Sequence, residues 1–407
     1  MVSRASIESA PAAAAPPVIA TREEAIERAR ALLPRIAERA RMTEEDRVVP
    51  AATIAELTAA GLLNLVTPRI FGGAELGFAD LVRVTAELAS ACGSTGWVYG
   101  VLAGHSWLLN LFPIEAAQEV FGDPNALTAT VFRLGGEVTE VAGGYRLVNG
   151  DGRFCSGIDH ASWVIVGNAV KRSDGTVEPR FFLIPRSDVE IVDDWFTAGM
   201  RGTGSRSIRI KESFIPAYRS CSLKDMLEGT APGAAAHRRA LYRMPFADVA
   251  PFSIIGAPLG IARGAIRSFA ASLEKGLSGK EELQIAEQSA SFARLAEASA
   301  DIDAAFALVV EDAARIDTAE AALPPLERAR IPRDWAYAAQ KSRYAVTRLF
   351  EASGGSGIYD GSTIQRMWRD VNGAAQHFAF GWDSAMTSFG RAAAGLQPGS
   401  FALKGRG

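Results

Sequence analysis

The chain has 407 residues, of which 48% are hydrophobic and 22% are charged, and its formal net charge is −3. This length allows two or three domains with large cores, and the even, slightly acidic charge without a Lys/Arg run argues against a nucleic-acid binder. The three cysteines, Cys92, Cys155 and Cys221, are odd in number and widely spaced, so they predict no metal site and no disulfide framework, and they fit a reducing cytoplasm.

The chain is predicted to begin with a disordered tail and a helical domain. Residues 1–20 are rich in Ala and Pro and lack the continuous apolar core of a signal peptide, so we interpret them as the tail. Residues 21–122 are predicted to form the helical domain. Thr21 and Glu24 make a capping-box pattern at its start, and apolar residues then recur at steps of three and four.

The most apolar segment of the helical domain covers residues 97–112. An amphipathic stretch at 78–91 precedes it, and residues 93–96 (GSTG) are expected to break the chain between the two helices. His105 and Asn110 interrupt the apolar run, which is shorter than a membrane span requires. We therefore expect a buried helix here.

Residues 123–230 are predicted to form a compact, β-barrel-like domain, because the hydrophobic period changes from helical to alternating. Residues 145–148 alternate, and Asn149-Gly150 offers a hairpin turn after them. Residues 163–166, 181–184 and 207–210 also have the composition and alternation of strands.

Residues 231–407 return to helical periodicity and predict an up-down bundle of four helices. The four periodic segments lie near residues 252–275, 283–316, 328–352 and 362–389. Polar or Pro-bearing joints separate them, notably at 323–325 and at Gly354-Gly355.

Three motifs make the chain similar to the acyl-CoA dehydrogenases over about residues 22–395. They are residues 199–205 (GMRGTGS), 256–263 (GAPLGIAR) and 354–366 (GGSGIYDGSTIQR). The resemblance implies an acyl-CoA dehydrogenase-like fold, with an N-terminal α-helical domain, a central β domain and a C-terminal four-helix bundle. The chain departs from the dehydrogenases at 128–136, which lacks their Thr-Glu-Pro-x-Ala-Gly-Ser-Asp-like segment. Asp360 falls near one place of the dehydrogenase base, but its setting favours a solvated turn.

Three other segments resemble the two-component flavin monooxygenases that share this fold. They are residues 91–105, residues 152–163 (GRFCSGIDHASW), and Arg369-Asp370 followed seven residues later by His377. The family includes oxygenase components that hydroxylate p-hydroxyphenylacetate and steroid-derived phenols, and dibenzothiophene monooxygenase. The resemblance implies reduced FMN or FAD, O2 as co-substrate, and oxygen transfer to a small aromatic or heteroaromatic substrate through a flavin C4a-hydroperoxide. It also implies a separate NAD(P)H:flavin reductase as partner, in agreement with the absence of a Gly-x-Gly-x-x-Gly fingerprint after a strand.

The same resemblance assigns roles to individual residues. His105, His377 and Ser156 are expected to be catalytic: His105 on the substrate side, His377 on the oxygen-binding side and Ser156 facing flavin N5. The ordinary pKa of histidine also lies in the range that a general base needs. The expected cofactor-binding residues are Trp97, Ser156, Gly157, Arg263, Gly354, Gly355, Ser356 and Arg369, and the expected substrate-binding residues are His105, Phe132, His160 and Trp107.

Each of these residues also has a purely structural interpretation. For His160 this is a hydrogen bond to a strand edge, for Arg369 an ion pair or hydrogen bond with Asp370 or Glu351, and for Gly354 and Gly355 a helix–helix turn. His237 is expected to be solvated in a polar connector. Two alternative functions stay open: a dehydrogenase acting on an acyl thioester, and a catalytically silent flavin-fold scaffold. A homotetramer built as a dimer of dimers is expected, in the cytoplasm, with no nucleic acid and no membrane as partner.

Overall fold

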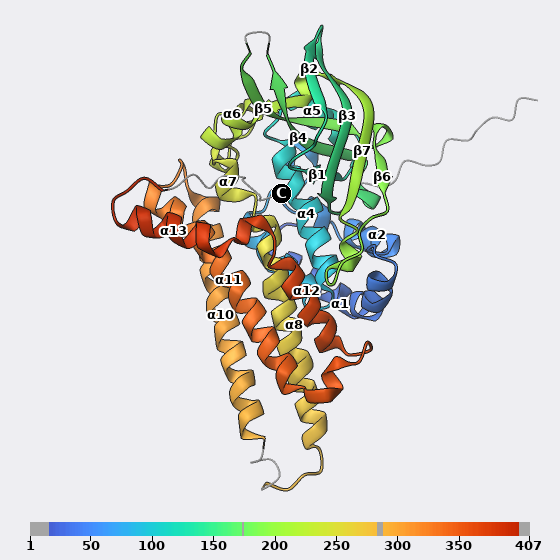
Figure 1. The fold of residues 1–407 in the computed structure, drawn as a ribbon, viewed down its shortest axis with the longest axis vertical. Helices are drawn as coiled ribbons and strands as arrows, with labels where there is room; N and C mark the ends of the chain where they lie inside the picture. Colours follow the sequence, from blue (N-terminus) through green and yellow to red (C-terminus); the bar gives the residue numbers. More distant parts are fainter. Residues whose placement is uncertain (1–15, 173–174, 283–287, 399–407) are drawn as a thin grey trace, which may run out of the picture.

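The computed structural model describes residues 16–172, 175–282 and 288–398 and has two helical regions with a sheet between them in sequence (Figure 1). Residues 1–15 of the predicted tail lie outside this range. In Figure 1 the sheet lies at one end of the molecule, and the long helices of the second helical region extend to the other end.

The N-terminal region is helical, as predicted. Its helices are α1 (Arg22–Glu45), α2 (Ala51–Ala59), α3 (Phe78–Ala89), α4 (Gly93–Leu109) and α5 (Ile114–Phe121), with short 3-10 turns η1 (Leu62–Asn64) and η2 (Arg69–Phe71). The Thr21 side chain accepts a hydrogen bond from the Glu24 amide, which confirms the predicted cap. Residues 93–96 do not break the chain as expected. They form the first turn of α4, and the non-helical link between α3 and α4 is residues 90–92.

Eight strands form the central sheet. They are β1 (Thr128–Val131), β2 (Glu137–Val141), β3 (Gly144–Cys155), β4 (Trp163–Lys171), β5 (Val177–Pro185), β6 (Glu190–Val192), β7 (Arg206–Pro216) and β8 (Ser220–Ser222), with turns η3 (Ile158–His160), η4 (Arg186–Asp188), η5 (Arg201–Thr203) and η6 (Ala217–Arg219). The hydrogen-bonded order is β6-β7-β3-β2-β4-β5-β8, and β1 pairs in parallel with β4. Alternate side chains of β5 belong to two hydrophobic cores. Phe181 and Leu183 pack in the core that the helices form, whereas Phe182 and Ile184 pack in a second core formed by residues of the β region.

The hairpin turn predicted at Asn149-Gly150 is wrong. β3 continues through both residues, and Gly150 pairs with Ile210 of β7. Asn149 takes a left-handed φ of 52°, so the signal marks an irregularity inside a long strand. The turn that joins β2 to β3 lies instead at Gly143, where φ is 79°.

The C-terminal region has the predicted long helices. After α6 (Leu223–Glu228), η7 (Pro232–Ala236), η8 (Ala240–Arg243) and α7 (Phe246–Val249), it contains α8 (Phe252–Leu277), α10 (Ser289–Thr318), α11 (Pro325–Ala352), η9 (Gly354–Ile358), α12 (Thr363–Ala374), η10 (Phe378–Phe380) and α13 (Trp382–Ala393). The fourth predicted helix, at 362–389, is in fact two helices. The chain leaves α12 after Ala374, and His377 caps the short turn η10 before α13 begins.

Glycines on α8 bring it against the N-terminal helices. A Cβ atom at Gly256 would lie 2.6 Å from the Val82 carbonyl oxygen of α3, and one at Gly260 would lie 2.3 Å from that of Ala86. Only glycine, whose side chain is a hydrogen atom, allows the two backbones to approach this closely. The contact between α3 and α8 joins the two helical regions.

The stretch Phe246–Leu277, which contains α8, is long and apolar enough to cross a membrane by those criteria alone. In the described structure most of it is buried by the other helices, which is the pattern of a core helix.

Candidate active site

Helix α4 runs through the centre of the molecule and carries Trp97 and His105 two turns apart, about 12 Å along the helix axis. Glycines again set its position: Cβ atoms at Gly100 and Gly104 would lie 1.9 Å from the Ser253 carbonyl oxygen and 2.6 Å from the Ser253 Cβ. The expectation of a buried helix is confirmed, because every residue of α4 is buried.

Trp97 joins the two halves of the expected flavin site. Its indole Nε1 donates a hydrogen bond of 3.3 Å to the Ser156 hydroxyl, at the end of β3. Its ring lies 5.6 Å from the His377 ring, centroid to centroid, in an edge-on arrangement. The structure therefore brings together three residues that are far apart in the sequence and that the resemblance placed beside a flavin.

His377 does not lie in the last helix, as expected, but in the link between α12 and α13. Its Nδ1 accepts a hydrogen bond of 3.3 Å from the Ala379 amide. A neutral imidazole that accepts at Nδ1 carries its proton at Nε2. Burial lowers the pKa of His377 to about 4, so at neutral pH the ring is uncharged and offers one donor, Nε2–H.

His105 has the opposite tautomer. Its Nδ1 lies 2.7 Å from the Thr128 carbonyl oxygen and 3.2 Å from the Thr130 hydroxyl of β1. Because a carbonyl oxygen only accepts, Nδ1 carries the proton and Nε2 keeps its lone pair. Burial lowers the pKa of His105 to about 4, partly offset by the bond to Thr128. Neither histidine therefore titrates near 6.5, contrary to the expectation from the free side chain.

Phenylalanines connect the His377 side of the site to the β1 side. Phe378 lies next to His377, and its ring centroid is 6.1 Å from that of Phe132, which follows β1 directly. Phe132 also contacts Phe181 and Phe246, each with centroids 6.1 Å away. Phe132, which was expected to bind substrate, is therefore the centre of an aromatic group next to His377.

Trp107 was expected to contact substrate, and the structure places it elsewhere. It is 1% exposed, donates from Nε1 to the Leu241 carbonyl oxygen at 3.3 Å, and packs between Phe78 and Phe246. It is a core residue behind Phe246, because the α4 side chain at this position faces the helical core. Phe246, which the sequence motifs did not indicate, contacts Phe132 and Phe181 in the aromatic group where Trp107 was expected.

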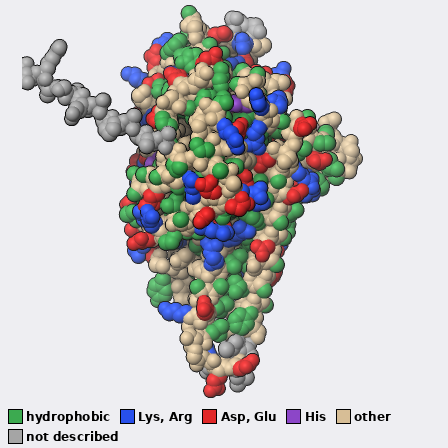
Figure 2. Space-filling view, turned by 180° about the vertical axis from the view of Figure 1, so that it is seen from behind, with side chains coloured by type: hydrophobic (Ala, Val, Ile, Leu, Met, Phe, Trp, Pro, Cys, Tyr) green, Lys and Arg blue, Asp and Glu red, His purple; other side chains and the backbone are tan. Residues whose placement is uncertain are grey.

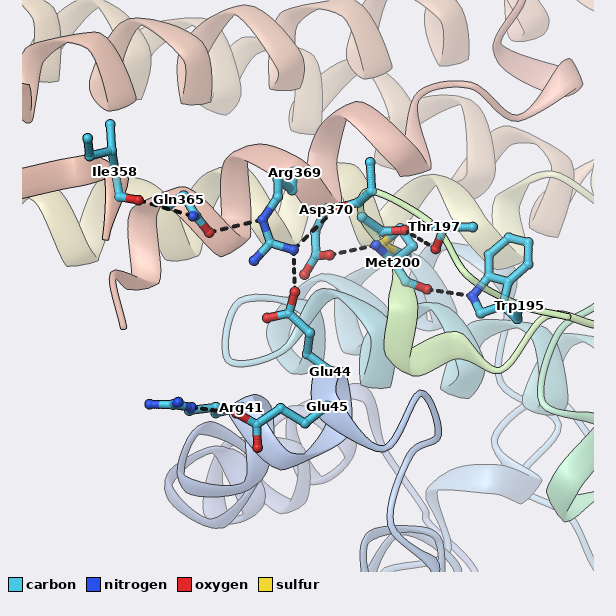
Figure 3. Close-up of polar contacts among 12 residues, drawn as sticks. Arg41, Glu44, Glu45, Trp195, Thr197, Met200, Ile358, Gln365, Arg369 and Asp370 are labelled. Atoms are coloured by element: carbon cyan, nitrogen blue, oxygen red, sulfur yellow. Dashed lines mark hydrogen bonds and ion pairs between the residues drawn. The ribbon is translucent and has the colours of Figure 1, made fainter. Parts of the chain in front are cut away.

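The loop before β7 is held against α12 by polar contacts (Figure 3). The buried Asp370 carboxylate accepts a hydrogen bond of 2.6 Å from the Met200 amide. Burial raises the pKa of Asp370 to about 6. Met200 has a left-handed φ of 56°, and Gly199 lies against the Arg369 backbone so closely that a Cβ there would be 2.0 Å from its carbonyl oxygen.

Arg369 was expected to bind the flavin phosphate, or to pair with Asp370 or Glu351. The structure shows a different partner: its guanidinium forms an ion pair with Glu44 at the end of α1 and donates to Gln365 at 2.9 Å (Figure 3). The bond to Glu44 raises the pKa of Arg369. Arg369 thus links the two helical regions, and its charge is already compensated.

Three of the other expected flavin contacts, Arg263, Gly354 and Gly355, have different surroundings from Trp97 and Ser156. Arg263 stacks on the Phe306 ring of α10, with its Cζ 3.6 Å from the centroid, and burial lowers its pKa. The glycines Gly354 and Gly355 lie in an exposed turn, where an added Cβ would meet no atom within 4 Å. Beside this turn is a cavity of about 410 Å³ with many hydroxyl groups, lined among others by Ser268, Ser272, Ser353, Ser356, Ser362 and Thr363.

The two remaining histidines lie outside this group. His160 lies beside Asp159, which forms an ion pair with Arg206, and its pKa is lowered by burial and partly restored by Asp159. Its backbone amide donates a hydrogen bond of 3.1 Å to the carbonyl oxygen of Gly157, an expected flavin contact next to Ser156. His237 is not solvated: it is 6% exposed and stacks on Tyr242 with centroids 4.0 Å apart. The connector folds back onto the core, which its polar sequence did not indicate.

The residues present fit a reduced flavin. The Ser156 hydroxyl, the indole of Trp97 and the His377 donor lie together at the junction of sheet and helices, and the Phe132 group supplies apolar surface beside them. Oxygen chemistry on a flavin needs a largely apolar site from which water is kept away. Trp97 is buried, whereas Ser156, Phe132 and His377 are partly buried and Phe378 is 39% exposed. The open glycine turn at 354–355 offers space where backbone can approach a phosphate.

Comparison with known proteins agrees with this geometry. Residues 20–120 match the family model described as acyl-CoA dehydrogenase, N-terminal domain, and residues 253–382 match the one described as acyl-CoA dehydrogenase, C-terminal domain. The flavin-dependent monooxygenase oxygenase subunit HsaA of Mycobacterium tuberculosis is 39% identical over 378 residues, which covers 90% of this chain and 94% of that protein.

Two other similarities extend the comparison. The oxygenase component of an FADH2-dependent resorcinol hydroxylase from Rhizobium is 33% identical and covers 88% of this chain and 91% of its own length. The crystal structure of the M. tuberculosis HsaA monooxygenase superposes with a TM-score of 0.87 at 36% identity, over 93% of this chain and 99% of the other.

Proposed function

This chain belongs to the oxygenase subunits of the flavin-dependent monooxygenases with the acyl-CoA dehydrogenase fold, and we propose that His377, His105 and Ser156 divide the work of its active site. The chain is the oxygenase component of a two-component system that acts on an aromatic substrate, and a separate reductase supplies its reduced flavin. Reduced flavin, when bound, supplies the electrons that activate O2 for transfer of one oxygen atom to the substrate.

The opposite tautomers of the two histidines are the observation that carries the assignment. His377 presents a fixed Nε2–H donor beside Trp97. A neutral donor that is held in place before the reaction can stabilise charge on oxygen as it develops, at no cost in reorganisation. We assign His377 to hold oxygen on the flavin side of the site.

His105 presents an Nε2 lone pair because Thr128 binds the proton on Nδ1. An acceptor in this position suits a substrate with an acidic O–H or N–H on its ring, which donates to Nε2 and gains electron density for attack. The proposal therefore narrows the aromatic substrate to a phenol or a comparable hydroxylated ring. Phe132 and Phe378 would hold the flat substrate ring beside the Nε2 acceptor of His105 and keep water away.

The flavin phosphate is proposed to lie near the turn at Gly354, Gly355 and Ser356 of a neighbouring subunit in a homotetramer. This turn is exposed and its glycines face open space. The next residues, Ile358 and Tyr359, are 66% and 72% exposed, which is unusual for large apolar side chains unless another surface covers them. Figure 2 also shows hydrophobic side chains gathered over the long-helix end of the molecule.

The proposed partners and location follow from the same assignment. The reductase would use NADH or NADPH, since the sequence shows no nicotinamide fingerprint of its own. A cytoplasmic location agrees with the three cysteines, which are all free and buried in the described structure.

The experiment that tests the proposal supplies reduced flavin and O2 to the purified protein with a panel of phenols, and measures both hydroxylated product and H2O2. His377→Phe keeps an aromatic ring against Trp97 but removes the donor. It should lower coupled product formation by a factor on the order of 100, the typical loss of one such donor, and should release H2O2 with or without substrate.

His105→Ala should leave oxygen activation intact and reduce product by a factor on the order of 10 to 100, as loss of one buried hydrogen-bond partner does. Ser106→Ala is the matched control on the same helix, because its hydroxyl only bonds the Ala103 carbonyl. If both histidine variants form product as the native protein does, the site assignment is wrong. A protein that reduces a dye with acyl-CoA and makes no hydroxylated product would instead be a dehydrogenase. The exposed position of Asp360 speaks against that alternative.

A further inference from the structure

Three hydroxyl groups form a continuous line from the flavin site into the protein. The Ser156 hydroxyl lies 2.6 Å from that of Ser205, which lies 2.7 Å from that of Thr203. The Thr203 hydroxyl lies 2.9 Å from the Met200 carbonyl oxygen. Ser205 and Thr203 are 5% and 2% exposed, so water does not compete for these bonds.

Counting protons fixes the direction of every bond in this line. A carbonyl oxygen cannot donate, so Thr203 must donate its single proton to Met200. The bond between Thr203 and Ser205 then requires the Ser205 proton, and the bond between Ser205 and Ser156 requires the Ser156 proton. The Ser156 hydroxyl, which also accepts from Trp97, has one lone pair left and no proton to offer to a ligand.

The backbone at this point offers no donor either. The Ser156 amide donates to the Phe154 carbonyl at 3.1 Å, and the Gly157 amide donates to the Thr203 carbonyl at 3.2 Å. Residues 156–157 therefore present acceptors only.

We propose that this hydroxyl line makes Ser156 an obligatory hydrogen-bond acceptor, and that it thereby selects reduced flavin over oxidised flavin. Reduced flavin carries a proton on N5 and can donate it to Ser156, whereas N5 of oxidised flavin has only a lone pair. The inference rests on the proposed function, in which Ser156 faces N5. Ser205 and Thr203 act through Ser156 and are positioning residues.

Accommodating oxidised flavin would require all three hydroxyl protons to turn toward the ligand. Thr203 would then donate to Ser205, and Met200 would lose the Thr203 bond. Two further hydrogen bonds fix the Met200 backbone in its position as acceptor. The Met200 amide donates to the Asp370 carboxylate, and Trp195 donates to the Met200 carbonyl oxygen at 3.1 Å. The left-handed φ of Met200, 56°, is a conformation that L side chains adopt only when their surroundings require it.

The test is the anaerobic dissociation constant of oxidised FAD and of dithionite-reduced FAD, measured for the native protein and for Ser205→Ala and Thr203→Val. Either variant removes one hydroxyl acceptor from the line, so the proton of the Ser156 hydroxyl becomes free to donate to flavin N5. Oxidised FAD should therefore bind about tenfold tighter, the typical factor for one mispaired buried hydrogen bond, while reduced FAD binds as before. A tenfold change corresponds to a two-electron midpoint potential of bound FAD about 30 mV lower.

Three further variants make the result specific. Ser205→Thr keeps a hydroxyl and should keep the native preference. Ser156→Ala should weaken reduced FAD. Ser207→Ala removes a neighbouring buried hydroxyl that bonds Asp194 and should change neither constant. General damage to the loop weakens both redox states, so tighter binding of oxidised FAD cannot arise from it.

Unchanged constants in both Ser205→Ala and Thr203→Val would overturn the inference, and so would equal affinities of the native protein for the two redox states. In those cases hydroxylated product from phenols would still support the proposed function. A native protein that binds neither form of FAD and forms no product would overturn the proposed function itself.

Discussion

Burial and a single backbone contact define what each histidine of the site can do. His105 and His377 both have pKa values lowered to about 4, so both are neutral at pH 7. Thr128 holds the proton of one ring on Nδ1, and Ala379 holds that of the other on Nε2. Two residues of one type therefore serve as acceptor and donor, and the difference comes from their neighbours.

Asp370 is a buried carboxyl whose protonation should affect stability. Its pKa in the folded protein is about 6, above the ordinary 3.8. The folded state therefore favours the protonated form, and this contribution to stability is complete below about pH 4 and is lost as the pH rises through about 6, by up to about 3 kcal/mol.

Asp370→Asn removes the titration and keeps a carbonyl oxygen for the Met200 amide. We expect the unfolding free energy of the native protein, relative to this variant, to fall as the pH rises from about 4 to about 7. Denaturant unfolding of both proteins at several pH values measures it. A difference that stays constant over this range would show that Asp370 is not the titrating group.

At the scale of elements, the joint between α3 and α8 depends on close backbone contact. Gly256, Gly260 and Gly264 recur every four residues on α8, and a Cβ atom at any of them would lie 2.6 Å or less from a carbonyl oxygen of the chain segment 82–90. The same helix contacts α4 through Ser253, so a shift of α8 also displaces the helix that carries Trp97 and His105.

Gly260→Ala and Gly276→Ala are a matched pair within α8. Gly276 has no atom within 4 Å of an added Cβ, so alanine there should stabilise the helix by about 0.5–1 kcal/mol. At Gly260 the Cβ would lie 2.3 Å from the Ala86 carbonyl oxygen, and alanine should destabilise by about 1–3 kcal/mol or more through overpacking. Thermal unfolding of the two variants compares them directly. Equal effects of the same sign would contradict the role of close packing.

At the scale of the whole molecule, the exposed turn after α11 is the surface from which we expect assembly. Ile358→Asp and Tyr359→Glu should break the proposed homotetramer, because each places a charge in a contact that apolar side chains would otherwise fill. Light scattering should give four times the 43.2 kDa chain mass for the native protein and less for the variants, with weaker binding of reduced flavin.

Ile70→Asp is the control for this experiment, since Ile70 is 63% exposed on the N-terminal region, in η2. It should leave mass and flavin binding unchanged. A native protein that is monomeric at micromolar concentration would refute the assembly and the shared flavin site together.

Local signals in the sequence accounted for most of the helices and strands. The capping box at Thr21, the apolar run of α4 and the alternating strands each act within a few residues, and the structure agrees with them. The same signals failed where a neighbouring element decides the outcome. Asn149-Gly150 stays in a strand because β7 pairs with it, and His237 is buried because Tyr242 covers it.

The sequence by itself indicated the class of fold through periodicity and the family through short motifs, and the comparisons confirm both. The roles of Ser156, His105 and His377 came from the family resemblance and stay predictions. Only the tertiary structure decided which nitrogen of each histidine carries the proton and which way the Ser156 hydroxyl points. Those properties depend on Thr128 and Ser205, which are far in sequence from His105 and Ser156, and on Ala379, which bonds His377 only because the chain turns there into η10. A hydrogen bond has a direction only when both partners are in place, so the chain had to fold before its site acquired donors and acceptors.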